Sequence, residues 1–283
     1  MLKISDQGLC YHANFPHYGS QALGASPKGA LDQLSFQSAK TLLGEPLTCQ
    51  IIEIVYPPKC EFTQDCLFVL TGAAFKRAYL KIHDESYRVR HATVIYAPAG
   101  SELILGKKAY GFRTYLAVTP VAQENYKRLN ISRGVFSRWF SWYKIGQAIR
   151  VIEGPENKIL KNKDQFLEAH WKISHHSDNM GLRLESEKPL DFDAYSMISE
   201  AVTDGTIQLT QSGPIVLMRH RQTIGGYPRI YNVISSDIDV LGQYMPGQTL
   251  HFETVSLEQA QAIHNQKVNE LNYFREFFLN YKT

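Results

Sequence analysis

The sequence predicts a mainly β protein built as two halves, and three observations support this fold class. Short runs of β-branched and aromatic residues recur along the 283-residue chain, and turn-forming residues separate them at frequent intervals. The runs do not alternate with helical patterns in the manner of βα units. The apolar content of 44% and charged content of 20% are those of an ordinary globular protein. We therefore expect closed or packed β architecture, with a boundary near residue 150.

The expected strands fall into two sets, one for each half. The first set is Gln50–Tyr56, Leu67–Leu70, Tyr79–Ile82, Thr93–Tyr96, Glu102–Leu105 and Arg113–Val118. The second set is Ala148–Ile152, Gly181–Glu185, Thr206–Leu209, Ile215–Met218, Ile230–Ile234 and Thr249–Phe252. Both halves share this density of strands, although no exact internal repeat is visible.

Two helices stand out against this background. Asp32 is placed to cap the first, apolar and small residues follow at helical spacing as far as Leu42, and Gly44 stands where a glycine stop belongs. The second begins at Ser256, with Gln259 three residues on, which is the spacing of a capping box. Its apolar stripe is expected to lie mostly in the core, with an aromatic end that is also suited to a partner: Leu257, Ala260, Ile263, Val268, Leu271, Phe274 and Phe278.

Two further segments are less regular. Residues 164–171 have the pattern of a third, short helix. Residues 120–147 form a long connection with local charge, which contains Arg128, Arg133, Arg138, Trp139, Trp142 and Lys144.

Composition excludes several classes of protein. The net charge is only +3 and no basic run has the density of a nucleic-acid-binding surface. No apolar run approaches the roughly 18 residues of a membrane span, and the start of the chain lacks the apolar core of a signal peptide. The four cysteines form no Cys-x-x-Cys pair. Because no secretion signal is recognisable, we expect reduced thiols, mostly as small core residues, in a cytoplasmic protein.

Common catalytic and nucleotide-binding motifs are absent from the sequence. It contains no phosphate-binding P-loop, no dinucleotide glycine fingerprint after a strand and no Gly-x-Ser-x-Gly elbow. The His-Glu-x-x-His zinc pattern is also missing. These absences disfavour several self-contained enzymes, but they leave room for a site shared between chains.

The segment from Arg221 to Asp237 is the strongest candidate for a binding site. Gly225-Gly226 permits tight or positive-φ backbone geometry, and Pro228 then fixes φ. A stiff loop of this kind presents Gln222, Thr223, Tyr227 and Arg229 between two strand-like runs, and polar donors on a stiff loop suit a binding site. The alternative is a decorated hairpin turn.

Three other segments carry polar groups of interest. Asp178 and Arg183 are plausible binding groups, or they pair with each other; the adjacent His175 and His176 point opposite ways on an extended segment and do not readily chelate one metal. The stretch Gly24 to Asp32 approaches the first helix, where Asp32 is expected to satisfy the helix amides itself, with the roles of Ser26 and Lys28 left open. Thr71-Gly72-Ala73 follows a strand and is typical of a bulge or of close packing.

Three blocks of residues together resemble a known family. They are Gly24 to Asp32 with Leu42-Leu43-Gly44 and Ile52-Glu53; Ser177 to Leu184; and Ser199 through Gly205-Thr206-Ile207-Gln208, Gly213-Pro214-Ile215 and Gln222 to Pro228, ending at Val233-Ile234 and Asp237. In order and spacing they resemble the allophanate hydrolase subunit 2 or carboxyltransferase-type family. This family includes the C component of bacterial 5-oxoprolinase and the antagonist of a sporulation-kinase inhibitor.

The resemblance implies a fold, partners and an activity. It implies two cyclophilin-like β-barrel lobes with two or three helices, over residues 1–150 and 151–283, the second carrying the terminal helix. It implies a related partner protein, the B component, that completes the site, and a third subunit with which the complex uses ATP to open the lactam ring of 5-oxoproline to glutamate. The chain has no lysine in an Ala-Met-Lys-Met context, so it carries no biotin of its own, and no metal is expected on it.

The chain departs from the family pattern in its N-terminal half. Where members show Gln-Asp-x-Gly-Arg, this chain has the stretch Ala13 to His17, which removes a fixed charge pair. The stretch Tyr115-Leu116-Ala117-Val118 runs into Thr119-Pro120-Val121 rather than into glycines, and the Gly-Ser-Arg-Ser-Thr motif is not recognisable. His220 replaces the acidic residue before Arg-Gln-Thr. We expect a divergent member whose activity is altered or lost.

The sequence therefore leads to one main hypothesis and two alternatives. The main one is a component, of the C type, of an ATP-dependent 5-oxoprolinase-like hydrolase of a small amide or lactam. Its binding or partner contacts would come from Gln222, Thr223, Tyr227 and Arg229, then from Asp178, Arg183 and Gln208, with no residue assigned as nucleophile or base. The alternatives are a non-catalytic regulatory binding protein, and the carboxyltransferase component of a biotin-dependent urea or amide carboxylase.

Overall fold

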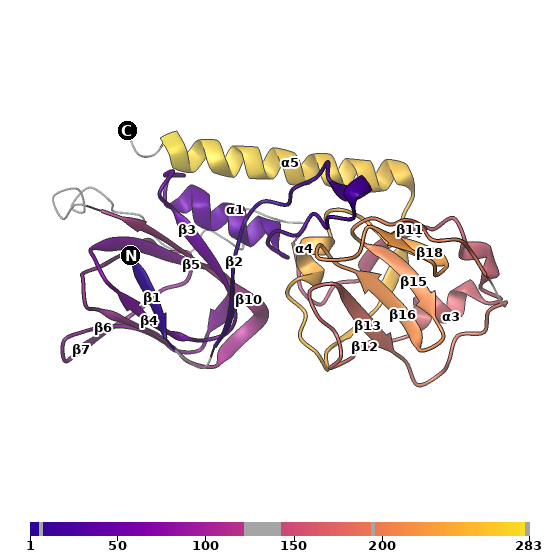
Figure 1. The fold of residues 1–283 in the computed structure, drawn as a ribbon, viewed down its shortest axis with the longest axis horizontal. Helices are drawn as coiled ribbons and strands as arrows, with labels where there is room; N and C mark the ends of the chain where they lie inside the picture. Colours follow the sequence, from indigo (N-terminus) through magenta and orange to yellow (C-terminus); the bar gives the residue numbers. More distant parts are fainter. Residues whose placement is uncertain (6–7, 122–142, 194–195, 281–283) are drawn as a thin grey trace. The chain divides into compact units, whose positions relative to one another are not determined.

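The computed structural model describes residues 1–5, 8–121, 143–193 and 196–280. The chain divides into two compact units (Figure 1). Unit 1 comprises Met1–Asn14, Asp32–Ser141 and Asn269–Thr283, and unit 2 comprises Phe15–Leu31 and Trp142–Val268. Segment 15–31 thus belongs to the second unit although it lies near the start of the sequence. The division into cyclophilin-like lobes at residue 150 stays a prediction.

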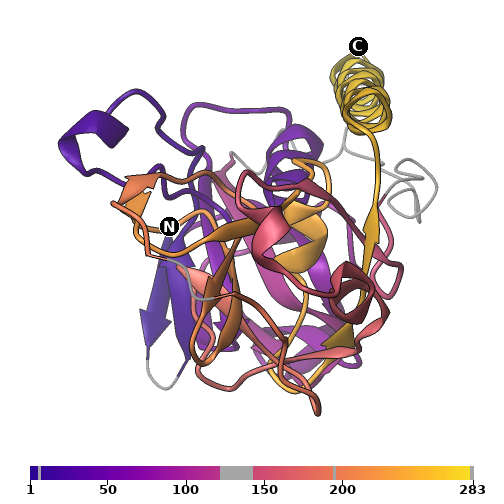
Figure 2. The ribbon, with the colours of Figure 1, turned by 90° about the vertical axis from the view of Figure 1, so that its right-hand side faces the viewer.

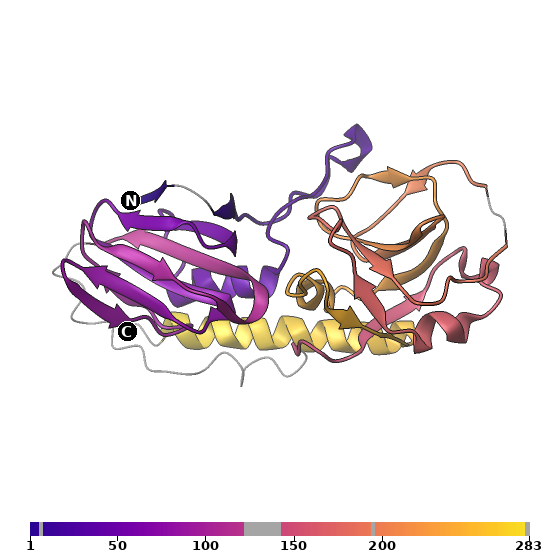
Figure 3. The ribbon, with the colours of Figure 1, turned by 90° about the horizontal axis from the view of Figure 1, so that it is seen from below.

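Unit 1 contains two five-stranded antiparallel sheets, whose curved strands are visible in Figure 3. The first has the order β1 (Leu2–Ser5), β4 (Lys59–Phe62), β9 (Glu102–Leu105), β6 (Ala78–Ile82) and β7 (Glu85–Arg88). The second has the order β2 (Leu9–His12), β3 (Gln50–Tyr56), β10 (Lys108–Pro120), β5 (Cys66–Phe75) and β8 (Ile95–Ala97). Both sheets contribute to one apolar cluster, which includes Ile54, Phe62, Phe68, Leu80 and Leu116.

Helix α1 (Gln33–Leu42) covers the second of these sheets, on β3, β5 and β10. The predicted cap is confirmed, because the Asp32 side chain accepts a hydrogen bond from the backbone N–H of Ser35 at 3.0 Å. The predicted stop is confirmed too, since Gly44 follows the helix with a φ of 81°. Burial on two sides explains why the five central residues of β3 are all buried rather than alternating.

Unit 2 is built on one eight-stranded sheet. Its order is β19 (Thr249–Leu250), β12 (Trp171–Ile173), β13 (Gly181–Glu185), β16 (Gly213–Leu217), β15 (Thr206–Thr210), β18 (Arg229–Val233), β11 (Ile149–Glu153) and β20 (Phe252–Thr254). The predicted strand over 249–252 is therefore two strands, with only His251 between them. Because these two strands stand at opposite ends of the strand order, the sheet curls into a nearly closed barrel.

Aromatic residues fill the unit 2 core. Phe166, on helix α3 (Lys163–Glu168), stacks on Tyr231 at 4.8 Å and on Phe252 at 5.0 Å between ring centroids. It also contacts Trp171 at 5.3 Å. The short helix expected near 164–171 is thus confirmed, although it ends before the strand that contains Trp171.

Unit 2 contains several further short elements, and Figure 2 shows this unit facing the viewer. They are the 3-10 helices η1 (Gln21–Leu23) and η3 (Asn157–Ile159), the short helix α4 (Ile238–Leu241), and the pair β14 (Glu200–Ala201) and β17 (Ile224–Gly225).

Helix α5 (Leu257–Asn280) begins as predicted but is less buried than predicted. The capping box is present, because the Gln259 side chain accepts from the N–H of Ser256 at 2.8 Å and the Ser256 hydroxyl accepts from the N–H of Gln259 at 3.2 Å. The apolar stripe is not a core stripe along its full length. Phe274 and Phe278 are buried, whereas Leu257 is 59% exposed.

Several other expectations can be compared with the described residues. The four cysteines are all free thiols, with Cys60 and Cys66 buried and Cys10 and Cys49 half-buried. Thr71-Gly72-Ala73 lies in β5, where Gly72 has a φ of 76° opposite an irregular part of β10. No helix in the described part of the chain is long and apolar enough to cross a membrane. Most of the charged connection over 120–147 lies outside the described residues.

Candidate functional site

The segment between β16 and β18 is a crossing connection, not a hairpin turn. Both strands pair with β15, which lies between them, so the chain must cross over β15 to join them. On its way, β17 pairs with β14, and the carbonyl of Thr223 accepts a hydrogen bond from the N–H of Val202 at 3.1 Å. The hairpin alternative is therefore wrong, and the segment is fixed by a small ladder of its own.

The two glycines of this segment allow neighbouring groups to lie close to the backbone, and neither has a positive φ. Gly225 lies over the side chain of Gln208, and a Cβ at position 225 would come within 2.4 Å of the Gln208 amide nitrogen. A Cβ at Gly226 would lie 3.2 Å from the Ser199 hydroxyl and 3.9 Å from the carbonyl oxygen of Met197, which is a much looser fit. The sequence predicted either tight packing or a positive φ at these glycines. Neither residue has a positive φ, so tight packing is the geometry that the segment adopts.

Two of the predicted site residues form an amide pair beneath Gly225. Gln208 is 2% exposed, and its Nε2 donates to the carbonyl of Tyr227 at 3.2 Å. The Nε2 of Gln222 donates to the Gln208 Oε1 at 3.4 Å. A side-chain amide that is both donor and acceptor, held on a buried neighbour, can recognise another amide group.

Arg229 is held by two carboxylates that the sequence did not suggest. Its Nε and Nη2 donate to the two oxygens of Glu156 at 2.9 and 2.8 Å, and Nη2 also donates to Glu200 at 2.6 Å. Nη1 donates to the carbonyl of Ala201 at 3.2 Å. The hydrogen bond from Arg229 lowers the pKa of Glu156, and the same bond raises the pKa of Arg229. The guanidinium therefore ties β18 to β14 and to the segment after β11.

A sequence signal for this ion pair existed in the residues just before Glu156. A Cβ at Gly154 would lie 2.1 Å from the carbonyl oxygen of Arg229, so only glycine fits there. A glycine followed by proline and glutamate at the end of a strand marks such a close approach. Its partner, 75 positions along the chain, is visible only after folding.

The outer side of the segment is apolar and exposed. Tyr227 is 50% exposed and Ile224 is 57% exposed, while Thr223 is half-buried. Ile198, which lies two residues before β14, is 88% exposed. Such side chains beside a fixed polar group are suited to contact with another molecule.

Asp178 and Arg183 are not an ion pair. The Asp178 carboxylate accepts from the N–H groups of Met180 and Gly181 at 2.8 and 3.2 Å, which closes a turn before β13. This turn lies along the start of the crossing connection, because Met218 N–H donates to the Met180 carbonyl at 2.8 Å. Arg183 is exposed and lines a separate hollow of about 460 Å³ with His176 and Ser174.

Segment 15–31 is bound to the same connection. The Ser26 hydroxyl donates to the carbonyl of Arg221 at 2.5 Å, and the N–H of Lys28 donates to the carbonyl of Arg219 at 3.1 Å. The His220 ring bonds the carbonyl of Gly29 at 2.9 Å. The glycine-rich stretch is thus a strap on unit 2, and Ser26, which the sequence left open, is one of its anchors.

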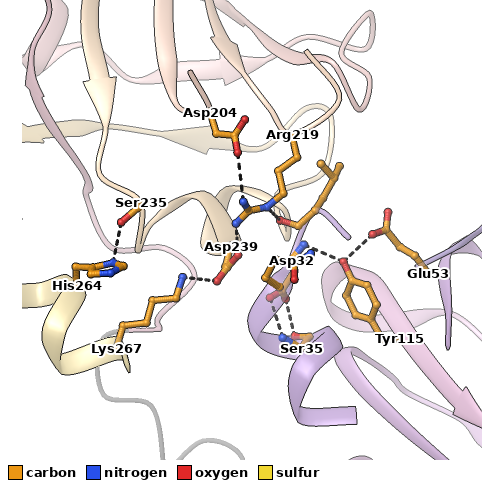
Figure 4. A network of polar contacts seen from close by, with 12 residues as sticks. Asp32, Ser35, Glu53, Tyr115, Asp204, Arg219, Ser235, Asp239, His264 and Lys267 are labelled. Atoms are coloured by element: carbon orange, nitrogen blue, oxygen red, sulfur yellow. Dashed lines mark hydrogen bonds and ion pairs between the residues drawn. The ribbon is translucent and has the colours of Figure 1, made fainter. Parts of the chain in front are cut away.

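Buried charges hold the strap in place (Figure 4). Arg219 contacts Asp204 at 3.4 Å and Asp239 at 2.9 Å, and Lys267 contacts the second oxygen of Asp239 at 2.6 Å. Arg221 lies 2.9 Å from Asp204. On the strap itself, the Tyr18 hydroxyl donates to Asp204 at 2.9 Å. We call Asp204, Arg219, Arg221, Asp239 and Lys267 the buried charge chain.

Opposing effects set the protonation of the two central members of this chain. Burial acts to raise the pKa of Asp239, but the charges of Lys267 and Arg219 outweigh it, so the pKa lies below its ordinary value. Burial acts to lower the pKa of Arg219, and the carboxylates of Asp239 and Asp204 reverse that effect and raise it. Asp239 and Arg219 are therefore both charged at neutral pH, and each charge depends on its neighbours.

Unit 1 has a buried polar cluster of its own, formed by residues of the first motif block and by Tyr115 (Figure 4). The Tyr115 hydroxyl donates to Glu53 at 2.7 Å and accepts from the N–H of Asp32 at 2.8 Å. Arg113 pairs with the other oxygen of Glu53 at 3.1 Å. Burial, then the charges of Glu53 and Asp32, raise the pKa of Tyr115 well above its ordinary value, so the phenol stays protonated.

The described residues contain no group of three or more His, Cys, Asp or Glu side chains that could hold a metal ion. What they do contain is a set of amide, hydroxyl and aromatic groups on the crossing connection and on the strands beside it. Gln208, Gln222, Thr223, Tyr227 and Arg229 are brought together there, and the Asp178 turn lies alongside, whereas the Arg183 side chain lines a different hollow.

The chain is similar to known proteins over most of its length. A family model described as carboxyltransferase domain, subdomain A and B, matches residues 23–125 and 121–254. The chain is 30% identical to the C component of 5-oxoprolinase from Haemophilus influenzae, covering 91% of this chain and 92% of that protein. It is 29% identical to the C component of 5-oxoprolinase from Escherichia coli, covering 92% and 93%.

A solved structure shares the fold. The urea amidolyase of K. lactis matches with a TM-score of 0.80 at 18% identity, over 96% of this chain and 20% of the larger enzyme. The family model covers well over half of the sequence and the expected motifs lie within it. The chain belongs to the family of carboxyltransferase domains, subdomain A and B.

Proposed function

We propose that this chain is the C component of an ATP-dependent 5-oxoprolinase, a complex that hydrolyses a small lactam or amide. The observation that carries the proposal is its similarity to the C component of the H. influenzae 5-oxoprolinase over nearly the full length of both proteins. Urea amidolyase shares the fold at 18% identity, which supports the carboxyltransferase alternative only weakly.

The crossing connection supports a role in recognising the lactam. A lactam offers one N–H donor and one carbonyl acceptor, and the Gln222 amide can pair with both. Gln208 holds Gln222 from below, and Gly225 leaves room for that contact. Thr223 and Tyr227 stand on the same rigid segment, so their hydroxyl groups complete the binding surface.

Arg229 has a positioning role in this proposal. Its guanidinium is already bonded to Glu156 and Glu200, so it orders the connection instead of meeting a substrate carboxylate. No described residue is assigned as nucleophile or general base. The reacting groups and ATP would be supplied by a B component and a third subunit, in the cytoplasm, with this chain contributing one wall of the site.

The test is reconstitution. The chain would be mixed with its B component and third subunit, and ATP-dependent release of glutamate from 5-oxoproline would be followed. We expect Gln222→Ala and Thr223→Ala to lower kcat/KM by about tenfold or more, because a hydrogen bond to bound substrate is lost. The matched control is Gln211→Ala, an exposed glutamine on the β15–β16 turn of the same unit. Turnover that is unchanged in both site variants would remove these assignments.

A non-catalytic binding role is the second candidate, and His220 favours it. The family pattern has an acidic residue at this position, whereas here the His220 ring is engaged with the Gly29 carbonyl, and so anchors the strap. A stable complex with the B component that gives no glutamate under any condition, with Tyr227→Ala weakening the complex, would identify this role instead.

A further inference from the structure

A hollow of about 520 Å³ opens in unit 1, and none of the proposed lactam-binding residues lines it. It is lined by the end of β5, the turn into β6 and the start of β6, and by the end of β7 with the segment that follows it. The lining residues are Phe75, Lys76, Ala78, Arg88, Val89, Arg90 and His91. Its size falls within the range of roughly 300–1,000 Å³ that is common for small-molecule pockets.

The charge of this hollow is entirely positive. Lys76, Arg88 and Arg90 line it, and no carboxylate does. Within the part of unit 1 that the structure describes, none of these three cations takes part in an ion pair, unlike Lys3 with Glu61, Arg113 with Glu53 and Arg275 with Glu45. Three like charges that share one concave surface repel each other, and an anion removes that repulsion.

Neighbouring turns extend the positive surface. The N–H of Lys76 donates to the carbonyl of Lys107 at 2.9 Å, and the N–H of Gly106 donates to the carbonyl of Arg77 at 2.9 Å. The β5–β6 and β9–β10 turns are therefore locked together, and the exposed Arg77 and Lys107 add two cations beside the hollow. These two turns are about 30 positions apart in the chain, so no basic run marks them in the sequence.

The backbone that carries the cations is held firmly. The N–H of Val89 donates to the carbonyl of Ala78 at 2.9 Å, and the N–H of Ala92 donates to the carbonyl of Leu70 at 2.8 Å. Between them, the His91 ring bonds the carbonyl of Gly72 at 3.0 Å. Arg88 and Arg90 thus project from a segment anchored at three points, which lowers the entropy lost when they bind a ligand.

We propose that this hollow binds the phosphate group of a small organic ligand. A phosphate carries enough charge to balance several cations, and arginine forks match its oxygens in pairs. Phe75, Ala78 and Val89 provide an apolar wall for the organic part. The inference concerns a different surface from the proposed lactam site and is tested by binding alone, so either can fail without the other.

The experiment uses the intact chain with pyrophosphate and ATP as probes. Binding is measured by calorimetry at about 0.1 M salt, and the site is located by amide chemical shifts in NMR. We expect saturable binding, with shifts concentrated at Lys76 and at residues 88–91. Arg88→Gln and Arg90→Gln should each weaken binding by about tenfold or more, because a charge-assisted contact is lost.

Lys81→Gln is the matched control. Lys81 is exposed on β6 of the same hairpin and is paired in register with Ser86, towards the other end of the hairpin from the hollow. This variant should change affinity by less than about twofold, since screening weakens distant charges. The proposal is overturned if neither probe binds, if the shifts lie elsewhere, if Lys81→Gln matches the arginine variants, or if a hexaglutamate peptide binds more tightly than both probes.

Discussion

Replacing Asp239 by Asn tests whether the buried charge chain stabilises unit 2 or makes no net contribution to its stability. The Asp239 side chain has no exposed surface and accepts from Lys267 at 2.6 Å and from Arg219 at 2.9 Å. Asn keeps the shape but removes the charge. Arg219 would retain Asp204 at 3.4 Å, and Lys267 would lose its 2.6 Å contact with the carboxylate at position 239.

The magnitude follows from which charges remain. The side chains of Arg219 and Lys267 are 8% and 11% exposed, so both cations stay largely desolvated after the substitution. Removing one partner of a buried pair destabilises a protein by about 3–5 kcal/mol, because it leaves uncompensated charge in the interior. We expect a loss in this range, confined to the unfolding of unit 2.

The assay is urea denaturation at neutral pH, followed by far-UV circular dichroism and tryptophan fluorescence. Hydrogen exchange supplies a local readout, because Arg219 also donates to the Leu31 carbonyl at 3.4 Å and the strap should exchange faster in the variant. The matched control is Glu61→Gln. Glu61 forms an exposed pair with Lys3 at 3.7 Å, and its loss should be worth less than about 1 kcal/mol.

The sign of the pH dependence is an independent check. The pKa of Asp239 is lowered in the folded chain, so its contribution is fully present above the unfolded pKa and is lost as pH falls through the folded pKa. The variant should therefore lose less stability than the parent in acid. A destabilisation equal to that of Glu61→Gln, with unchanged exchange in the strap, would refute the reasoning.

Three further outcomes are expected. Gly225→Ala should destabilise the chain by about 1–3 kcal/mol, because its Cβ would displace the buried Gln208 amide. Gly226→Ala should be nearly neutral. The free energies of unfolding of both variants, measured by denaturation, test this difference. The pKa of Glu156 is lowered in the folded chain, so its contribution to stability is present above the ordinary pKa of glutamate and is lost as pH falls through the lowered pKa. Glu156→Gln should remove this contribution, and the free energy of unfolding should then fall less steeply in acid. Tyr115→Phe should destabilise unit 1 by about 1–3 kcal/mol, because the N–H of Asp32 and one oxygen of Glu53 each lose a buried partner; a loss below about 0.5 kcal/mol would contradict this.

Local patterns in the sequence were enough for the elements and their ends. The Asp32 cap and the Ser256–Gln259 capping box each join residues three positions apart, and the Gly44 stop depends on one backbone angle, so all three can be predicted without the fold. The mainly β class and the motif blocks that identify the family likewise depend only on the order of residues along the sequence. Gln208 and Gln222 could be proposed as candidate binding residues for the same reason.

The tertiary structure decided every pairing between distant residues. Glu156 and Arg229, Asp239 and Lys267, and the strap on Arg219–Arg221 each join segments that sequence spacing does not connect. The apolar stripe of α5 shows the same limit, because an amphipathic pattern states which face is apolar but not how much of it is covered. Burial and charge pairing are properties of three-dimensional neighbours, and those neighbours are set by the strand order of the two units.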